Sequence, residues 1–307
     1  MAPTLLWIGL GNMGRGMCKN IVEKADLSSP LLLHNRSVQR AVDLSNKLSS
    51  DKTEVVEDLA AGVSKADIIF TCVSNDEAIN ATFETMLQGH VKNKVFVECS
   101  TVHPETTEAL AKAATAAGAE FVAAPVFGAP AAAEAGQLIG VLAGPRASVD
   151  KAKPYFKGVM AKAEIDMTDK PYGQALKLKV LGNTFVLAMV EQLAEAHTVA
   201  EKSGLGTEYV NDFVQALFGG PYAAYSSRML GGAYHKMKEP LFGVDLARKD
   251  ARHAKSLATD AGVQMKIVET ADQHLAQVQE HAGSLGDIAG IYGAVRKESG
   301  LKFENDA

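Results

Sequence analysis

The chain has 307 residues, of which 47% are hydrophobic and 22% are charged, and its formal net charge is −5 at pH 7. This composition excludes a largely disordered chain, and the acidic balance argues against binding to nucleic acid or an anionic membrane, because phosphate affinity needs clustered Lys and Arg. The length is about twice that of a common domain, so we expect two domains.

Cysteine usage and hydropathy indicate the compartment. Cys18, Cys72 and Cys99 are too few and too scattered for a disulfide framework or a zinc site, and the histidines form no metal-binding pattern. No run of about eighteen apolar residues occurs, and the N-terminal apolar run meets glycines too early for a signal peptide. We therefore expect a soluble, cytoplasmic protein that has no metal site and does not contact a membrane.

From residue 4 to about 165, short apolar runs alternate with segments of helical periodicity. The apolar runs lie at residues 5–10, 31–34, 68–73, 95–99, 121–124 and 138–142. The first of them is followed directly by a helical segment at 13–24. Strands that alternate with helices predict βαβ units and a mostly parallel, doubly wound sheet.

The second half of the chain is predicted to be all-helical. Helical spacing occurs in the segments 173–203, 209–218, 245–261 and from 266 onward. The first of these is one long helix, which Gly204 and Gly206 end. Asp169-Lys170-Pro171 interrupts the strand pattern, so we expect an N-terminal α/β domain at 1–168 and an all-α domain at 169–307.

A glycine-rich motif, Gly9-Leu10-Gly11-Asn12-Met13-Gly14, joins the first predicted strand to the first helix. In a Rossmann fold the first glycine makes the tight turn, the second admits the pyrophosphate, and the third lets helix and strand pack closely. The helix N-terminus then offers N–H groups and the positive end of its dipole to the phosphates. The alternative is a tight turn with no ligand, but position and flanks favour dinucleotide binding by all six residues.

The end of the second predicted strand indicates which dinucleotide binds. An NAD enzyme places Asp or Glu roughly twenty residues past the glycine motif to hold the ribose 2′-hydroxyl. Here that place is taken by Asn35-Arg36-Ser37, with Arg40 one helical turn further on. Guanidinium groups match the oxygens of a 2′-phosphate, so we predict NADPH and assign these four residues to its binding. The alternative is a solvated basic loop.

Four further stretches extend the pattern. They are Glu98-Cys99-Ser100-Thr101, Ala124-Pro125-Val126-Phe127-Gly128, Lys179-Val180-Leu181-Gly182-Asn183 and Lys249-Asp250. In order and spacing, from residue 5 to about 260, the chain resembles the β-hydroxyacid dehydrogenase family. The resemblance implies a Rossmann domain joined by a long helix to an all-α domain, and a homo-oligomer, either a dimer or a tetramer.

Two predicted strand ends carry hydroxyl groups. Ser100 and Thr101 follow an apolar run, and ligands bind at that edge of an open α/β sheet. The alternative is a cap for a helix starting near Pro104. The resemblance implies that Ser100 contacts the substrate and Thr101 the cofactor. It also places Val73 and Ser74 against the ribose or nicotinamide, where the alternative is an ordinary strand end.

Lys179 and Asn183 are four residues apart on the predicted long helix, so they share one face. A carbonyl reduced by hydride needs a proton on its oxygen, and a lysine whose pKa is lowered can supply it. The alternatives are a solvated helix face and Lys177 as the acid. The resemblance implies Lys179 as general acid/base, Asn183 as its partner, and Lys249 as a cofactor ligand, for which the alternative is an exposed helix charge.

One stretch departs from the family pattern. The family has a serine where this chain has Phe127, and a second glycine where it has Ala129. A hydroxyl donor of the carboxylate-binding loop is therefore replaced by an apolar ring, although the backbone N–H groups of Gly128 and Ala129 could still hold a carboxylate. We expect Phe127, Gly128 and Ala129 to contact the substrate together with Ser100, Lys179 and Asn183.

These residues predict an NADPH-dependent oxidoreductase that interconverts a small aldehyde or keto acid and its hydroxy acid. An imine reductase on the same fold is the alternative, which Phe127 favours and Lys179 opposes. A decarboxylating enzyme acting on a phosphorylated sugar acid would need more basic residues and a longer chain. A third hypothesis, from another class, is a protein that binds NADPH without catalysis.

Overall fold

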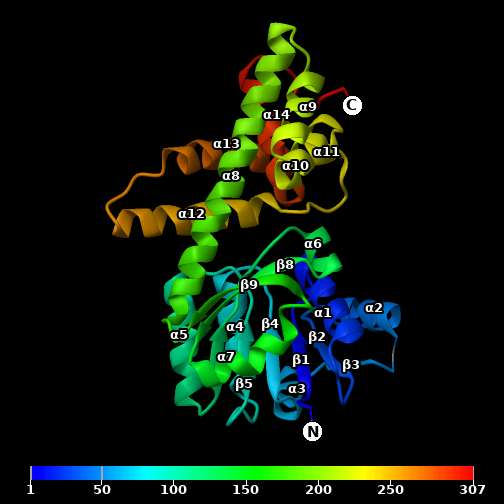
Figure 1. The fold of residues 1–307 in the computed structure, drawn as a ribbon, viewed down its shortest axis with the longest axis vertical. Helices are drawn as coiled ribbons and strands as arrows, with labels where there is room; N and C mark the ends of the chain where they lie inside the picture. Colours follow the sequence, from blue (N-terminus) through cyan, green and yellow to red (C-terminus); the bar gives the residue numbers. More distant parts are fainter. Residues whose placement is uncertain (1, 50, 307) are drawn as a thin grey trace. The chain divides into compact units, whose positions relative to one another are not determined.

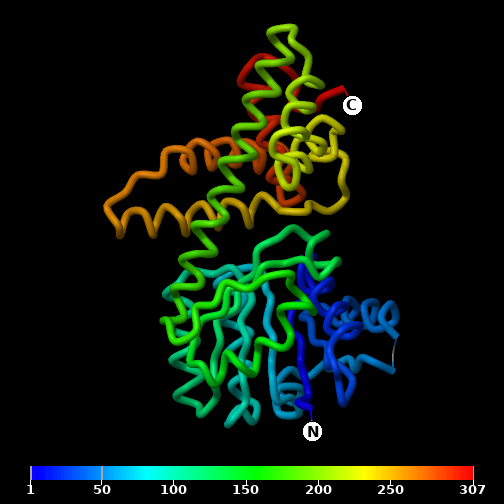
Figure 2. Tube along the Cα trace, viewed as in Figure 1, coloured from blue at the N-terminus to red at the C-terminus, as the bar shows by residue number. Residues whose placement is uncertain are grey.

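The computed structural model describes residues 2–49 and 51–306, and the chain can be followed from blue to red in Figure 2. It divides into two compact units, residues 1–179 and residues 180–307. We call them the N-terminal unit and the C-terminal unit. The described residues contain no helix that is both long and apolar enough to span a membrane.

A mixed sheet forms the centre of the N-terminal unit (Figure 1). Its strands are β1 (Leu5–Ile8), β2 (Leu31–His34), β3 (Thr53–Val55), β4 (Ile68–Thr71), β5 (Val95–Glu98), β6 (Glu120–Ala123), β7 (Val126–Phe127), β8 (Leu138–Gly144) and β9 (Ala161–Thr168). The order is β3-β2-β1-β4-β5-β6-β8-β7, with β9 beside β8. Strands β1 to β6 are parallel, whereas β8 is antiparallel to β6 and β7.

Helices cover both faces of this sheet. They are α1 (Asn12–Lys24), α2 (Val38–Leu48), α3 (Leu59–Lys65), α4 (Asp76–Met86), α5 (Pro104–Ala116), α6 (Pro130–Ala135) and α7 (Arg146–Ala152). Alternate strand residues point to opposite faces, so Trp7 packs in one core with α1 and α2 while Leu6 packs in the other with α3, α4 and α5. The predicted doubly wound α/β fold is confirmed.

Three strands were not predicted from the sequence. Strands β3 and β7 are three and two residues long, too short to show a period. Strand β9 has mostly half-buried or exposed side chains, because it pairs only with β8 at an edge of the sheet. Short length therefore hides β3 and β7 in the sequence, and low apolar content hides β9.

The C-terminal unit is helical. It contains most of α8 (Tyr172–Ser203) together with α9 (Thr207–Leu217), α10 (Gly220–Leu230), α11 (Ala233–Lys236), α12 (Val244–Asp260), α13 (Lys266–Ala282) and α14 (Ile291–Glu298). No strand occurs between residues 180 and 306, so the all-α prediction is confirmed. Gly204 and Gly206, with φ of 75° and 96°, end α8 as expected.

A buried charged group links three helices of this unit. His274 on α13 lies 2.8 Å from the Glu191 carboxylate on α8 and 3.2 Å from Glu298 on α14. Glu191 and His274 are 4% and 8% exposed, so water screens their attraction weakly. The contact with Glu191 raises the pKa of His274 to about 9.

The His274 ion pairs make the protein less stable as the pH rises. The folded-state pKa of His274 lies above the ordinary value of 6.5, so its contribution is complete below about pH 6.5 and is lost as the pH rises through about 9. We expect the free energy of unfolding to fall by about 3 kcal/mol across this range. In His274→Gln the fall should disappear.

Urea denaturation at pH 6 and pH 9.5 measures this difference. His281→Gln is the matched control, because His281 pairs with Glu304 at the surface of the same unit and is 36% exposed. Equal pH dependence in the wild-type protein and in His274→Gln would contradict the assignment.

Candidate active site

The glycine-rich turn between β1 and α1 is built by close backbone contacts. Gly9 has φ of 97°, and a Cβ atom there would lie 2.2 Å from the Cys72 carbonyl oxygen on the neighbouring chain segment. A Cβ atom on Gly14 would lie 2.1 Å from the Gly9 carbonyl oxygen. The indole nitrogen of Trp7 donates to that same carbonyl at 2.9 Å. The first and third glycines are therefore required by packing.

Gly11 differs from these two glycines. A Cβ atom built there meets nothing within 4 Å, and Gly11 is the N-cap of α1. Space above a helix N-terminus that lacks a capping side chain suits an anionic group. The residues of this turn therefore fit the pyrophosphate of a dinucleotide, in the roles predicted for the motif.

The strand order reverses between β1 and β4, which is where open α/β sheets bind ligands beyond the carboxyl ends of their strands. Several of the predicted cofactor residues meet there. The Asn35 side-chain oxygen accepts from the Leu10 N–H at 2.9 Å, and its amide nitrogen donates to the Ser37 carbonyl at 3.0 Å. Asn35 thus joins the end of β2 to the glycine turn.

The basic residues after β2 are open to solvent. Arg36 and Ser37 follow β2 directly, Arg40 lies in the first turn of α2, and all three are exposed. Their accessibility is compatible with a phosphate ligand and also with a solvated loop. The Arg40 N–H donates to the Ser37 carbonyl at 3.1 Å, which holds the start of α2 against this loop.

The ends of β4 and β5 come together through Ser100. Its hydroxyl accepts from the Val73 N–H at 2.8 Å, and its own N–H donates to the Glu98 carboxylate at 2.8 Å. Thr71 on β4 also donates to Glu98, at 3.4 Å. Glu98 is 1% exposed and therefore positions Ser100 from within the sheet.

Ser100 and Thr101 do not cap the following helix. The N-cap of α5 is His103, whose Nδ1 accepts from the Glu105 N–H at 3.3 Å. The Ser100 hydroxyl is instead bound to Val73, from a different strand end. The proposed alternative of a helix cap is wrong, because a residue three places further on takes that role. Glu98 was not predicted from the sequence as a positioning residue, although it is the first residue of the Glu98–Thr101 stretch.

Phe127 and Lys179 meet within the N-terminal unit. The Lys179 Nζ atom lies 4.6 Å from the centroid of the Phe127 ring, a cation–π distance. Lys177, the alternative acid, is exposed on the same helix. Of the other residues predicted to hold the substrate, Gly128 and Ala129 are exposed at the end of β7.

A second cluster lies within the C-terminal unit. The Asn183 amide nitrogen on α8 donates to the Asp250 carboxylate on α12 at 2.6 Å. Lys249 Nζ lies 3.4 Å from the same carboxylate, and Lys249 and Asp250 are 7% and 3% exposed. The alternative of an exposed charge at Lys249 is therefore wrong. No role was predicted for Asp250, because nothing in the sequence indicates that its carboxylate pairs with Asn183, 67 residues earlier.

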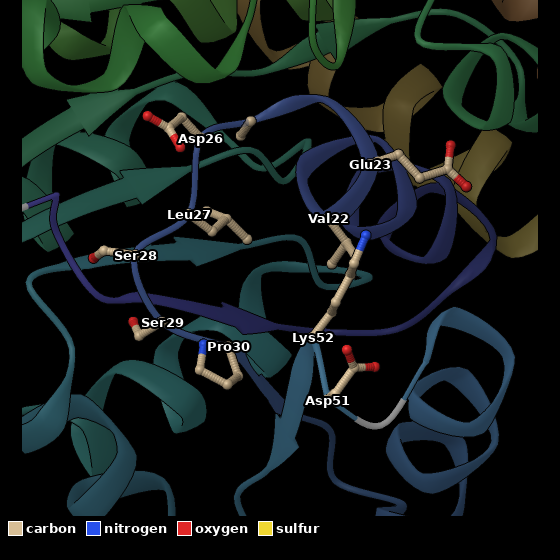
Figure 3. A pocket seen from close by; sticks show the side chains of 10 residues that line it. Val22, Glu23, Asp26, Leu27, Ser28, Ser29, Pro30, Asp51 and Lys52 are labelled. Carbon is tan, nitrogen blue, oxygen red and sulfur yellow. The ribbon is translucent and has the colours of Figure 1, made fainter.

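The pocket in Figure 3 is formed by other residues of the N-terminal unit. It is lined where α1 ends and where β2 and β3 begin, by Val22, Glu23, Ala25, Asp26, Leu27, Ser28, Ser29, Pro30, Asp51 and Lys52. None of the predicted site residues lines it. Because ligands of an open α/β sheet bind at the opposite ends of the strands, this hollow is not the candidate active site.

Burial limits the reactivity of two of the three cysteines. Cys18 and Cys99 are buried free thiols, and Cys72 is partly buried. Burial raises the pKa of the Cys18 and Cys99 thiols, which keeps them protonated and unreactive. Among the described residues no cluster of His, Cys, Asp and Glu could hold a metal ion.

Two family models match the chain. The model described as the NAD binding domain of 6-phosphogluconate dehydrogenase matches residues 4–169. The model described as "NAD-binding of NADP-dependent 3-hydroxyisobutyrate dehydrogenase" matches residues 173–295. Together they cover both the α/β region and most of the helical region.

Curated relatives match over nearly the whole chain. The NADH-dependent oxidoreductase ucdB of Aspergillus ustus is 40% identical over 292 residues, which cover 95% of this chain and 98% of that protein. Glyoxylate/succinic semialdehyde reductase 1 of Arabidopsis thaliana is 26% identical and covers 92% and 94% of the two chains.

Solved structures share the fold. Psf3 in complex with NADP+ and 2-OPP has a TM-score of 0.82 at 23% identity, over 95% of this chain and 100% of that one. A 3-hydroxyisobutyrate dehydrogenase from Salmonella typhimurium has the same TM-score at 20% identity, over 96% and 99%. A reductive aminase from Aspergillus terreus has a TM-score of 0.59 at 14% identity, over 95% and 98%.

The surroundings of Gly14 and Gly11 predict that an added methyl group lowers stability at the first position and cofactor binding at the second. Gly14→Ala should lower the free energy of unfolding by about 2 kcal/mol, because the new Cβ atom meets backbone that must move. Gly11→Ala should cost less than about 1 kcal/mol but weaken dinucleotide binding about tenfold or more, since it fills the open space at the helix N-terminus.

Thermal melting and titration of cofactor fluorescence measure the two effects separately. The variants serve as controls for each other, because they add the same group three residues apart. Wild-type cofactor affinity in a folded Gly11→Ala protein would contradict the placement of the pyrophosphate.

Proposed function

The chain belongs to the β-hydroxyacid dehydrogenase family and is an NAD(P)-dependent oxidoreductase acting on CH–OH groups, and on this premise we propose its substrate, cofactor and catalytic residues. We propose that it interconverts a small aldehyde or keto acid and the corresponding hydroxy acid, with NADPH as the cofactor. The observation that carries the proposal is the position of the Lys179 ammonium group over the Phe127 ring. Lys179 lies on α8, the helix that also bears Asn183.

The chemistry requires one proton for each hydride. A nicotinamide cofactor held at the glycine-rich turn would supply the hydride. Lys179 donates a proton from Nζ to the carbonyl oxygen as negative charge develops there, and it takes the proton back from the hydroxyl group in the reverse direction. Lys177 is a weaker candidate, because it is exposed to water.

Asn183 and Ser100 orient the substrate in this proposal. The Asn183 amide nitrogen is bound by Asp250, which directs the amide oxygen away from that carboxylate. The Ser100 hydroxyl accepts from Val73 N–H and so keeps its own hydrogen for donation to a substrate oxygen. Residues 127–129 form the remaining side of the substrate site.

The proposed cofactor residues follow the sequence prediction. In the N-terminal unit they comprise residues 9–14, Asn35, Arg36, Ser37, Arg40, Val73, Ser74 and Thr101. In the C-terminal unit Lys249 is assigned to the cofactor. Its burial beside Asp250 supports a role other than a solvated surface charge. We retain residue 168 as the proposed end of the cofactor-binding domain.

The preference for NADPH rests on Arg36 and Arg40, which are exposed at the end of β2 where a 2′-phosphate would lie. Names of similar proteins point both ways. The Aspergillus ustus relative is named NADH-dependent, whereas Psf3 is described in complex with NADP+. The absence of Asp or Glu at position 35 favours NADPH.

A homo-oligomer in the cytoplasm completes the proposal. Large apolar side chains on α8 and α9 of the C-terminal unit are exposed, among them Phe185 at 79%, Tyr209 at 61% and Leu217 at 62%. Apolar surface of this kind is typical of a face that another copy covers. The free thiols agree with a reducing compartment.

Imine reduction remains the second candidate, because the apolar ring of Phe127 suits an uncharged imine. The reductive aminase from Aspergillus terreus shares the fold. A cyclic imine run beside the aldehydes with NADPH separates the two activities. Turnover of the imine alone would replace the carbonyl reductase proposal.

Replacement of the proposed acid tests the mechanism. Lys179→Met should lower kcat for carbonyl reduction by about 100-fold or more, because the variant keeps the apolar stem and loses the proton donor. Its affinity for NADPH should remain within about threefold of the wild-type value. Lys177→Met is the matched control, and we expect it to behave like the wild-type protein. A Lys179→Met protein with normal turnover would remove this residue from the mechanism.

Cofactor choice has its own test. We expect kcat/KM for NADPH to exceed that for NADH by about tenfold or more. Arg36→Gln should reduce the NADPH value by about tenfold through KM and leave the NADH value unchanged, since each guanidinium contact to phosphate is charge-assisted. Gln39→Ala, in the exposed first turn of α2, is the control for nonspecific effects. A wild-type preference for NADH would refute the NADPH assignment.

A further inference from the structure

The Lys179 Nζ atom, the proposed proton donor, lies 4.6 Å from the centroid of the Phe127 ring, and this contact affects which substrates can bind. We propose that Phe127 is a specificity-determining residue that selects aldehydes carrying an uncharged apolar group and discriminates against carbonyl compounds with a carboxylate at that end. The inference rests on the proposed role of Lys179 and changes the proposed product, because an aldehyde without that carboxylate is reduced to an alcohol and not to a hydroxy acid.

The backbone fixes the position of the ring. Phe127 pairs with Ile139 across the β7–β8 ladder, and its side chain packs against the core that contains Phe121. Gly128 follows with φ of 138°, and a Cβ atom there would lie 2.6 Å from Leu138. The positive φ of Gly128 therefore favours glycine in this turn, and Phe127 cannot shift along the strand without breaking the ladder.

The ring restricts what can approach Lys179. The face of a benzene ring carries partial negative charge, so it attracts the ammonium at 4.6 Å and repels a carboxylate placed against it. A carbonyl oxygen that reaches Nζ comes from a side that the ring does not occupy, and a substituent that extends toward the ring meets an apolar surface. An apolar substituent loses water there at no electrostatic cost.

The sequence around Phe127 offers a carboxylate no polar side chain. Residues 121–133 contain only Phe, Val, Ala, Pro and Gly. Pro130, the first residue of α6, also has no N–H group to donate. A carboxylate taken from water onto this segment would find few groups to replace its hydration, which makes the segment selective against anions.

Two aldehydes of equal chain length, butanal and succinic semialdehyde, test the proposal because they differ in one carboxylate. For the wild-type protein we expect kcat/KM to favour butanal by about tenfold or more. In Phe127→Ser the ratio should move at least tenfold toward succinic semialdehyde, mainly through KM, since a hydroxyl donor replaces the ring. In Phe127→Leu, which stays apolar, the ratio should stay within about threefold of the wild-type value.

A binding measurement separates this inference from the reductase proposal. Butanamide and succinamate are unreactive analogues of the two aldehydes, and ligand-observed NMR gives their dissociation constants in the presence of NADP+ or NAD+. Tighter binding of butanamide by the wild-type protein, reversed in Phe127→Ser, supports the inference even if neither aldehyde is reduced; the reductase proposal alone then fails. Tighter binding of succinamate by the wild-type protein, or an unchanged preference in Phe127→Ser, overturns the inference whatever the turnover.

Discussion

The rest of the N-terminal unit depends on the contact between the backbone of Gly9 and the Cα atom of Gly14. It brings the end of β1 so close to the first turn of α1 that no side chain fits at Gly14, and the Cys72 carbonyl oxygen leaves no room for one at Gly9. The turn also receives a hydrogen bond from Trp7 and donates through Leu10 to Asn35. This close contact therefore aligns the ends of β1 and β2 with the N-terminus of α1, which is the geometry that a bound pyrophosphate needs.

Buried carboxylates repeat this function of alignment elsewhere. Glu98 holds the N–H of Ser100, and Asp250 holds the amide of Asn183. Asp287 accepts from Arg228, from the N–H groups of residues 241 and 242 that precede α12, and from the N–H of residue 289. A carboxylate that accepts several hydrogen bonds can be buried at a low cost in free energy, because those bonds replace its hydration. Each of these groups fixes a segment that bears a proposed site residue or leads to one.

The substrate side of the site is built differently. Residues 121–133 are apolar throughout, and the contact that stands out there is between the Phe127 ring and the Lys179 ammonium. A charged proton donor beside an aromatic face combines reactivity toward a carbonyl oxygen with selection against anions. The proposed mechanism and the inferred selectivity therefore depend on one pair of residues, each contributed by a different secondary-structure element.

The sequence by itself determined the local features: the glycine turn, the alternation of strands and helices, and the long helix, predicted at 173–203 and observed at 172–203. These follow from short-range periodicity and backbone sterics. Only the tertiary structure decided the partners of Ser100, Asn183 and Lys179, because Val73, Asp250 and Phe127 are distant along the chain and no spacing rule relates them. Side-chain contacts across a fold depend on how its elements pack, which periodicity does not encode.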